Sequence, residues 1–194
     1  MKKLLPVRGA AFLLGAVASA SVFAWQGPPG FDPVNAFLGP GLLRHLGQQE
    51  VLPGKGEHYR MFWLPSFHPA EVVTLDVLPD GSGEVHHRIA RCAMESDCTG
   101  AASDQVFHVS PRQVDAFRTD MARMGLWKQQ RTIEDGIADG VAIIVDGASA
   151  QGHIRILRMS LCPGEGKPLA TFERVLQAFD RLQGKKPEPF CRYS

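Results

Sequence analysis

Alternating apolar and polar positions predict three groups of strands. The apolar run "HYRMFWLPSF" is typical of a strand, and Pro65 favours a place at a sheet edge. In "EVVTLDVLPDGSGEVHHRIARC" two alternating stretches flank Asp80-Gly81, which predicts a hairpin. A second hairpin is predicted in "GVAIIVDGASAQGHIRILRMSL". Its apolar positions change phase, so we expect a bulge near Ile156.

A helical period appears in "VSPRQVDAFRTDMARMG", between the two hairpins. Its apolar stripe consists of Val114, Phe117, Met121 and Met124. Ser110 and Gln113 form a capping-box pattern, Pro111 suits the first helical position, and Gly125 is a suitable end.

A second helix is predicted in "PLATFERVLQAFDRLQG", with Pro168 near its start and Gly184 after its end. Its stripe consists of Leu169, Phe172, Leu176 and Phe179. Hairpins dominate, and no strand–helix–strand repeat is evident. The sequence therefore predicts an α+β fold over residues 57–194: an antiparallel sheet of about five strands with two helices on one face.

The first 24 residues have the layout of a secretory signal peptide. Lys2, Lys3 and Arg8 precede an apolar stretch, and small residues ending at Ala24 or Ala20 have cleavage spacing. An uncleaved anchor is the alternative, but the uncharged run is short for a membrane span. A lipid anchor would need a cysteine just after the cleavage site. We therefore expect a bacterial periplasmic or secreted protein with no membrane span after cleavage.

Residues 25–56 are rich in Pro and Gly and favour a flexible leader. Only "GLLRHLGQQE" fits a short helix, and the alternative is a segment that folds against a partner. Cleavage after Ala24 leaves 18 basic and 20 acidic residues, because the signal holds three basic residues and no acid. A slightly acidic chain has no electrostatic footprint for nucleic acid.

The four cysteines favour disulfides, because an exported chain meets an oxidising compartment. Cys92 and Cys98 are separated by five residues, which fits neither a zinc pair nor a thioredoxin-type motif. Of the three possible pairings we expect Cys92–Cys98 and Cys162–Cys191. The tail after the second helix is long enough, when extended, to bring Cys191 back beside Cys162.

Residues 105–184 resemble small uncharacterised exported domains of proteobacteria. The resemblance rests on the helix ending in "MGLW", the "DG" turns after it, and a hairpin that leads to an apolar helix. None of these features is a catalytic motif, so the resemblance implies neither a function nor functional residues.

Two stretches approach catalytic motifs without matching them. "GASAQG" has Gln151 where a nucleophile elbow needs Gly, so we interpret Ser149 as part of a hairpin loop. "PGEGKP" lacks the first Gly and the final Ser or Thr of a phosphate-binding loop. In "EDGIADG" the acids Glu134, Asp135 and Asp139 lack the spacing of a calcium loop, and Asp-Gly turns are favoured.

The histidines are the remaining candidates for chemistry. Alternation places His86 with Glu84 and Arg88, and places His87 on the apolar face as a hydrogen-bonded core residue. The functional alternative has His87 meeting His108 or His153 to bind a metal or move a proton. Trp63 and Trp127 are interpreted as core residues, although Trp63 on an edge strand could contact a partner.

These observations favour a binding module over an enzyme, since no convincing nucleophile is present. The expected partner is another envelope protein, and an inhibitor or immunity-type role fits the small exported chain. No catalytic, cofactor-binding or metal residue is assigned. The alternative is a periplasmic hydrolase built from His87, His108 or His153 with Asp135 or Asp139.

Export gives the first prediction. The mature chain should begin at Trp25 or Ser21, which N-terminal sequencing of protein from the periplasmic fraction measures. An intact Met1 on protein recovered from the envelope would contradict it.

The cysteines give the second prediction. Peptide mapping without reduction should recover two linked pairs, Cys92–Cys98 and Cys162–Cys191. Free thiols or bound zinc in the exported protein would overturn it.

Overall fold

The computed structural model describes residues 41–49, 56–91, 101–128, 132–134, 141–160 and 167–186. The predicted signal segment, residues 1–24, lies outside these ranges. All four cysteines also lie outside them: Cys92, Cys98, Cys162 and Cys191. Export and disulfide pairing therefore stay predictions.

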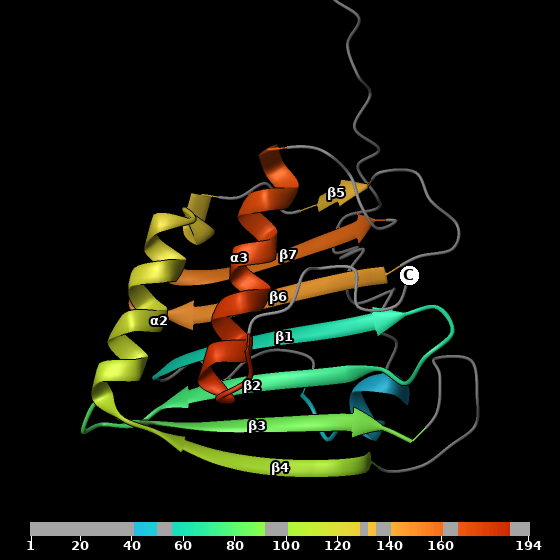
Figure 1. The fold of residues 1–194 in the computed structure, drawn as a ribbon, viewed down its shortest axis with the longest axis horizontal. Coiled ribbons are helices and arrows are strands. Elements are labelled where there is room, and N and C mark those ends of the chain that lie inside the picture. The colour runs from blue at the N-terminus through green and yellow to red at the C-terminus, as the bar shows by residue number, and fades with distance from the viewer. Residues whose placement is uncertain are drawn as a thin grey trace, which may run out of the picture.

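One sheet of seven strands forms the centre of the described structure (Figure 1). The strands are β1 Glu57–Pro65, β2 Glu71–Val77, β3 Gly83–Ala90, β4 Ala101–Val109, β5 Thr132–Glu134, β6 Val141–Ser149 and β7 Gly152–Ser160. Their spatial order is β4-β3-β2-β1-β6-β7-β5, and six of them pair antiparallel while the short β5 runs parallel to β7.

Beside the sheet, the described residues form the helices α2 (Pro111–Arg123) and α3 (Lys167–Leu182), the 3-10 turn η1 (Leu126–Lys128) and a helical turn at residues 41–45. Figure 1 shows α2 and α3 side by side on the same face of the sheet. The predicted α+β class is confirmed, although the sheet has six antiparallel strands and a short seventh where about five were expected.

The position predicted for the first strand is wrong. β1 is the central strand, paired with β2 on one side and β6 on the other. Pro65 is its last residue, where a proline can end a ladder without removing a hydrogen bond from the middle of the sheet. Trp63 is therefore buried in the core, and β1 offers no edge to a partner.

The bulge expected near Ile156 is also wrong. β6 and β7 pair in an unbroken register from Val141↔Ser160 to Ser149↔Gly152. The apolar phase changes because both faces of β7 are covered: Ile154 and Ile156 pack under the helices, whereas Leu157 packs on the opposite face.

A strand that the sequence did not predict is present at β4. Its sequence, "AASDQVFHV", mixes small, polar and apolar residues, and most of its side chains are exposed. It pairs with β3 through regular cross-strand partners from Gly83↔Val109 to Ile89↔Ser103, and the register shifts only beyond Ile89. An edge strand needs little apolar surface, so its sequence gives only a weak alternating signal.

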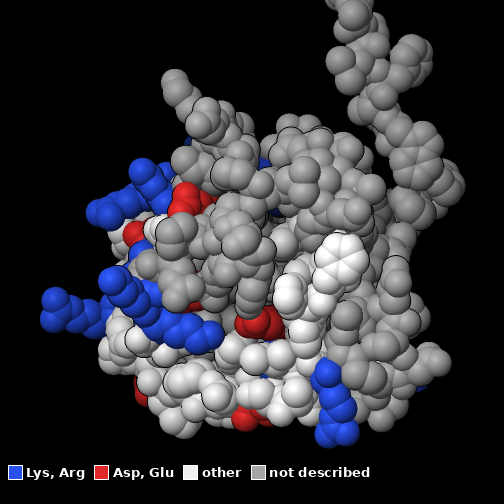
Figure 2. Space-filling model, turned by 45° about the vertical axis from the view of Figure 1, so that its right-hand side comes forward, with Lys and Arg blue, Asp and Glu red and all other residues white. Residues whose placement is uncertain are grey.

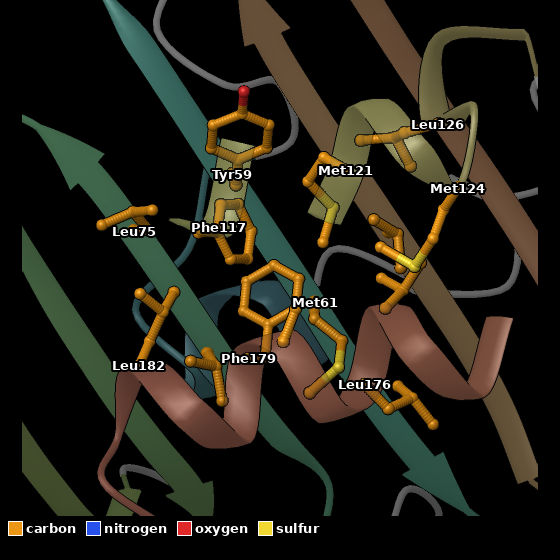
Figure 3. Packing of buried hydrophobic residues seen from close by; sticks show 14 of the residues in the cluster. Tyr59, Met61, Leu75, Phe117, Met121, Met124, Leu126, Leu176, Phe179 and Leu182 are labelled. Atoms are coloured by element: carbon orange, nitrogen blue, oxygen red, sulfur yellow. The ribbon is translucent and has the colours of Figure 1, made fainter. Parts of the chain in front are cut away.

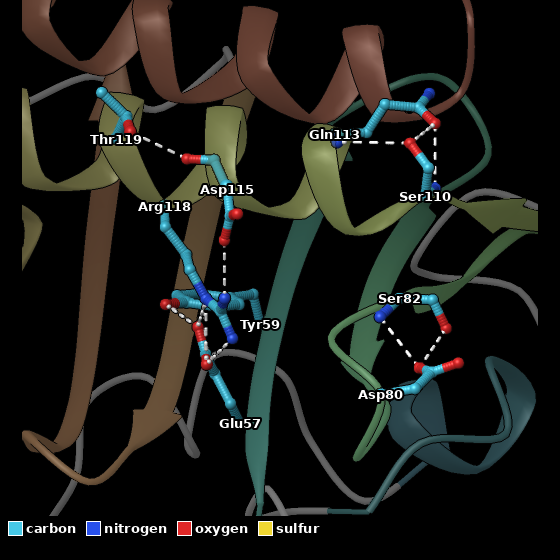
Figure 4. Close-up of polar contacts among 9 residues, drawn as sticks. All are labelled: Glu57, Tyr59, Asp80, Ser82, Ser110, Gln113, Asp115, Arg118 and Thr119. Carbon is cyan, nitrogen blue, oxygen red and sulfur yellow. Dashed lines mark hydrogen bonds and ion pairs between the residues drawn. The ribbon is translucent and has the colours of Figure 1, made fainter.

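The local signals for turns and caps are confirmed (Figure 4). Asp80 accepts hydrogen bonds from the backbone and the hydroxyl of Ser82, and Gly81 takes the positive φ that the β2–β3 turn requires. At the start of α2 the Ser110 hydroxyl accepts from Gln113 N–H, and the Ser110 N–H donates to the Gln113 side chain.

The helices bury one face of the sheet in the main core (Figure 3). Phe117 of α2 lies between two aromatic rings, with centroids 5.0 Å from Tyr59 of β1 and 5.1 Å from Phe179 of α3. Both contacts are edge-to-face, the favoured geometry for such pairs. These three rings join β1, α2 and α3, and the predicted stripe of α2 is buried at Val114, Phe117 and Met121.

The opposite face of the sheet, here called the second face, carries its own apolar cluster. The cluster contains Leu43, Leu46, Phe62, Leu64, Ala70, Val72, Ala90, Ala142, Ile144 and Leu157. Residues 41–49, which open with a helical turn at 41–45, supply Leu43 and the fully buried Leu46. Arg88 donates to the carbonyls of Leu46 and Gly47 and so ties this segment to β3.

Residues 41–49 belong to the segment for which a flexible leader was expected. Within this stretch the expectation is wrong, because its leucines cover apolar side chains that would otherwise face water. The short helix that "GLLRHLGQQE" was expected to allow is present at residues 41–45. The remainder of 25–55 lies outside the described residues.

The aromatic contact of Phe117 gives a third prediction. Phe117→Ala should lower the free energy of unfolding by about 3–5 kcal/mol, because it leaves a cavity between two rings. Ser110→Ala, which removes only the cap, should cost about 1 kcal/mol. Denaturant unfolding followed by circular dichroism measures both, and equal effects would contradict this packing.

Candidate functional site

The half of the second face around the start of β1 is polar, and we call its accessible part the polar strip. The strip consists of His58, Asp76, Glu84, His86 and His108. The register aligns His58 with Asp76, Asp76 with Glu84, and Glu84 with His108, so one row crosses β1, β2, β3 and β4. Strand alternation places these side chains on one face, because paired residues point the same way.

Each histidine of the polar strip lies near a carboxylate. His58 Nδ1 is 2.5 Å from Asp76 Oδ1, and His86 Nε2 is 2.7 Å from Glu84 Oε1. His108 Nδ1 is 4.0 Å from the second oxygen of Glu84. Asp76 and Glu84 therefore hold His58 and His86, whereas His108 lies beyond hydrogen-bond distance of Glu84.

The carboxylates of the strip remain open to solvent. The side chains of Asp76 and Glu84 are 43% and 36% exposed, and that of His108 is 79% exposed. His58 and His86 are more enclosed. The strip can thus accept hydrogen bonds from a basic or amide-bearing partner, with geometry fixed by the strands.

A buried ion network lies beside the strip, one row further along the strands. Asp146 of β6 is fully buried and lies between Arg60 of β1 and Arg155 of β7. Arg60 donates Nε and Nη2 to Asp146 Oδ2 at 3.0 and 2.5 Å. Arg155 donates to both oxygens, at 2.6 and 3.0 Å, so the carboxylate accepts four charge-assisted hydrogen bonds.

Arg60 also connects the network to residues 41–49. Its Nη1 donates to the carbonyl of Gln49 at 2.6 Å, and its guanidinium lies 4.8 Å from the centre of the Phe62 ring. Burial lowers the pKa of Arg60 from its ordinary value, and the Asp146 carboxylate opposes that shift. An arginine keeps its charge in proteins, so the network holds two buried cations on one buried anion.

The histidines singled out in the sequence do not converge. His87 is buried on the helix-covered face with Val85, as expected, whereas His108 lies on the second face. His153 is exposed on β7, five strand spacings from β4, or about 24 Å. His87 Nε2 lies 2.9 Å from Glu71 Oε2, a core hydrogen bond of the kind predicted.

The remaining sequence candidates have structural roles or lie elsewhere. Ser149 ends β6, and its hydroxyl accepts from the Gln151 N–H in a two-residue hairpin loop, as interpreted from the sequence. Asp135 and Asp139 lie outside the described residues. Trp127 packs against the main core.

Two features of this region were missed by sequence reasoning. The buried ion network had a signal, because Arg60, Asp146 and Arg155 each interrupt an apolar stretch of strand. Opposite charges in such positions favour pairing across a sheet. The polar strip had a signal only for His86 and Glu84, which alternation places on one face, because the rest depends on the register of four strands and on β4.

A second polar cluster ties the helix layer to β1 (Figure 4). Arg118 of α2 donates to both oxygens of Glu57, with contacts from 2.6 to 3.1 Å, and the Tyr59 hydroxyl donates to the same carboxylate at 2.8 Å. These bonds, with that from Arg118 foremost, lower the pKa of Glu57. Burial, followed by the bond to Glu57, raises the pKa of Tyr59.

Charges on the visible surface alternate in sign. Figure 2 shows Lys and Arg side chains with Asp and Glu between them, without one broad basic area among the described residues of that face. Arg118 pairs with Asp115, and Arg181 and Arg123 share Asp120.

Comparison of the sequence with protein-family models and with curated proteins finds no match. Among the helices that the structure describes, none combines the length and hydropathy of a membrane span. Within the same residues, no group of three or more His, Cys, Asp or Glu is arranged to hold a metal ion.

The buried ion network gives a fourth prediction. Asp146→Ala should destabilise the fold by about 3–5 kcal/mol, because it leaves two buried guanidiniums without their anion. The matched control, Asp115→Ala on the exposed side of α2, should change stability by at most about 1 kcal/mol. Comparable small losses for both variants in denaturant unfolding would show that Asp146 is not buried between the arginines.

Glu57 gives a fifth prediction, for the pH dependence of stability. Its pKa is lowered from 4.5 in the folded state, so its contribution is present above pH 4.5 and is lost as the pH falls through the lowered pKa. Glu57→Gln should therefore be less stable than wild type at neutral pH, and the difference should shrink below pH 4.5. Thermal unfolding across this range measures it, and a constant difference would contradict the ion pair with Arg118.

Proposed function

We propose that the protein is an exported binding module that holds a partner protein in the periplasm or outside the cell. The partner is another envelope protein, and the role is of the inhibitor or immunity type: occupation of a surface, with no chemical conversion. The observation that carries this proposal is the polar strip, with solvent-exposed carboxylates held on a rigid four-strand frame.

The geometry of the polar strip supports binding more than catalysis. His86 and His87 each form a hydrogen bond with a carboxylate, and these two residues lie on opposite faces of the sheet. A hydrolase would need a nucleophile within reach of a base and donors aimed at one reacting atom. Binding by fixed carboxylates on an open face requires only a partner surface with complementary hydrogen-bond donors.

The chemistry of the strip indicates the kind of surface it would hold. Asp76 and Glu84 are acceptors, so the complementary partner presents Lys, Arg or amide donors. A partner surface of this kind suits a chain whose mature form carries two more acidic than basic residues. The signal-peptide layout of residues 1–24 supports the location.

The experiment compares partner capture by the wild type and by a charge-neutral strip. Tagged protein is used to capture envelope proteins, which are identified by mass spectrometry and then tested individually by isothermal titration. Asp76→Asn combined with Glu84→Gln keeps the shapes and removes both charges. We expect this double variant to bind a captured partner at least tenfold more weakly, or about 1.4 kcal/mol.

The matched control is Asp115→Asn, which removes an exposed carboxylate on α2, across the domain from the strip. It should bind as the wild type does. Equal affinity of the wild type and the double variant would refute the strip as the binding surface. Turnover of a peptidoglycan, lipid or peptide substrate by the wild type would refute the binding role itself.

A further inference from the structure

We infer that the protein self-associates through its β4 edge, as a two-fold dimer in which β4 of one copy pairs antiparallel with β4 of the other. The dimer joins the two sheets edge to edge. The edge shares His108 with the polar strip, and the inference stands whether or not the strip binds a partner.

The sheet ends differently on its two sides. β5 forms one end and has three residues, a length typical of a protected edge. β4 forms the other and has nine, of which Ser103–Val109 pair with β3 in regular register. Figure 1 shows β4 as the outermost strand, with no described element beyond it.

β4 also lacks most of the features that prevent another strand from pairing with an edge strand. Its regular part contains no proline and no lysine, and the irregularity in its pairing lies beyond Ile89. Val106 at its middle is 49% exposed, one of three exposed large apolar side chains in the described part of the chain. A long edge with an exposed β-branched residue at its centre is a template for another strand.

Charge explains why a second copy fits this edge. Asp104 and His108 lie on the second face, each two residues from Val106. An antiparallel pair centred on Val106 sets the two Val106 side chains against each other. The same register sets Asp104 of each copy opposite His108 of the other. The apolar centre and both polar ends are thus satisfied at once.

Existing contacts extend this pattern across the junction. Arg88 donates to Asp104 at 3.0 Å, and His108 lies 4.0 Å from Glu84. In the dimer one row would run from Arg88 and Asp104 of one copy to His108 and Glu84 of the other, so that each carboxylate lies beside a nitrogen-bearing side chain. An unrelated strand would have to carry the same pattern to match it.

Sedimentation velocity of the purified protein over a range of concentrations tests the dimer. The weight-average mass should rise from one chain towards two as concentration increases. Val106→Lys places two cations at the two-fold axis and should weaken the dimer at least tenfold, since like charges directly opposite destabilise a strand pair. Phe67→Lys is the matched control: Phe67 is 76% exposed in the β1–β2 loop, away from the edge, and its loss should leave the dimer unchanged.

Cysteine cross-linking tests the register and remains decisive if Val106→Lys fails to fold. With Val106→Cys the two thiols face each other at cross-strand distance, about 4.5–5.5 Å between Cα atoms, and should form an intersubunit disulfide on mild oxidation. His108→Cys should not, because its two copies are offset by four residues, or about 13 Å. Mass spectrometry of the oxidised Val106→Cys variant identifies the two copies of the β4 peptide joined to each other. A wild type that stays monomeric at every concentration would overturn the inference, as would a dimer unaffected by Val106→Lys.

Discussion

The burial of Asp146 between two arginines is the interaction on which the second face depends. The central strand β1 must bury both of its faces, since helices cover one and residues 41–49 cover part of the other. An apolar cluster fills the half that holds Phe62 and Leu64. In the other half Arg60 faces inward, and a buried guanidinium is tolerated only when it is paired and hydrogen-bonded. Asp146 supplies that pairing and Arg155 completes it.

This arrangement determines which parts of the second face are exposed to solvent. The network fixes β7, β6 and β1 side by side, and the rows continue outward through β2 and β3 to β4. Side chains become more exposed to solvent in the same direction, from the buried network to the partly exposed polar strip and then to the exposed β4 edge. The proposed binding surface and the proposed self-association edge are therefore the outer parts of one continuous face. A partner held on the strip of a dimer would meet two copies, which raises effective affinity without new contacts.

Local patterns in the sequence are sufficient to identify most elements of the fold. The α2 stripe and capping box depend on residues within one helix, and the Asp80-Gly81 turn depends on adjacent residues, so the sequence shows both directly. The position of β1 is not evident from the sequence because strand order depends on long-range pairing, and Pro65 can end a central strand as readily as it can mark an edge. The phase change in β7 suggests a bulge if only one face of the sheet is assumed to be buried. Residues 41–49 bury part of the second face as well, so apolar residues on both faces of β7 need no bulge.

The candidate site is less predictable than the fold. The pairing of His86 with Glu84 follows from alternation on a single strand, and the burial of His87 does as well. The strip as a whole needs β4, whose mixed sequence was not predicted as a strand, and it needs a register that aligns four strands. Convergence of His87, His108 and His153 is an open possibility in the sequence, and only sheet order and face decide it.

Native-state amide hydrogen exchange, resolved by residue, tests the central place of β1 most directly. The backbone amides of β1 and β6 should exchange only through global unfolding, because both strands lie between hydrogen-bonded neighbours and among buried side chains. Amides of β4 should exchange faster at low protein concentration, where the edge is unpaired. Exchange of β1 amides as fast as that of β4 would contradict a sheet built around β1.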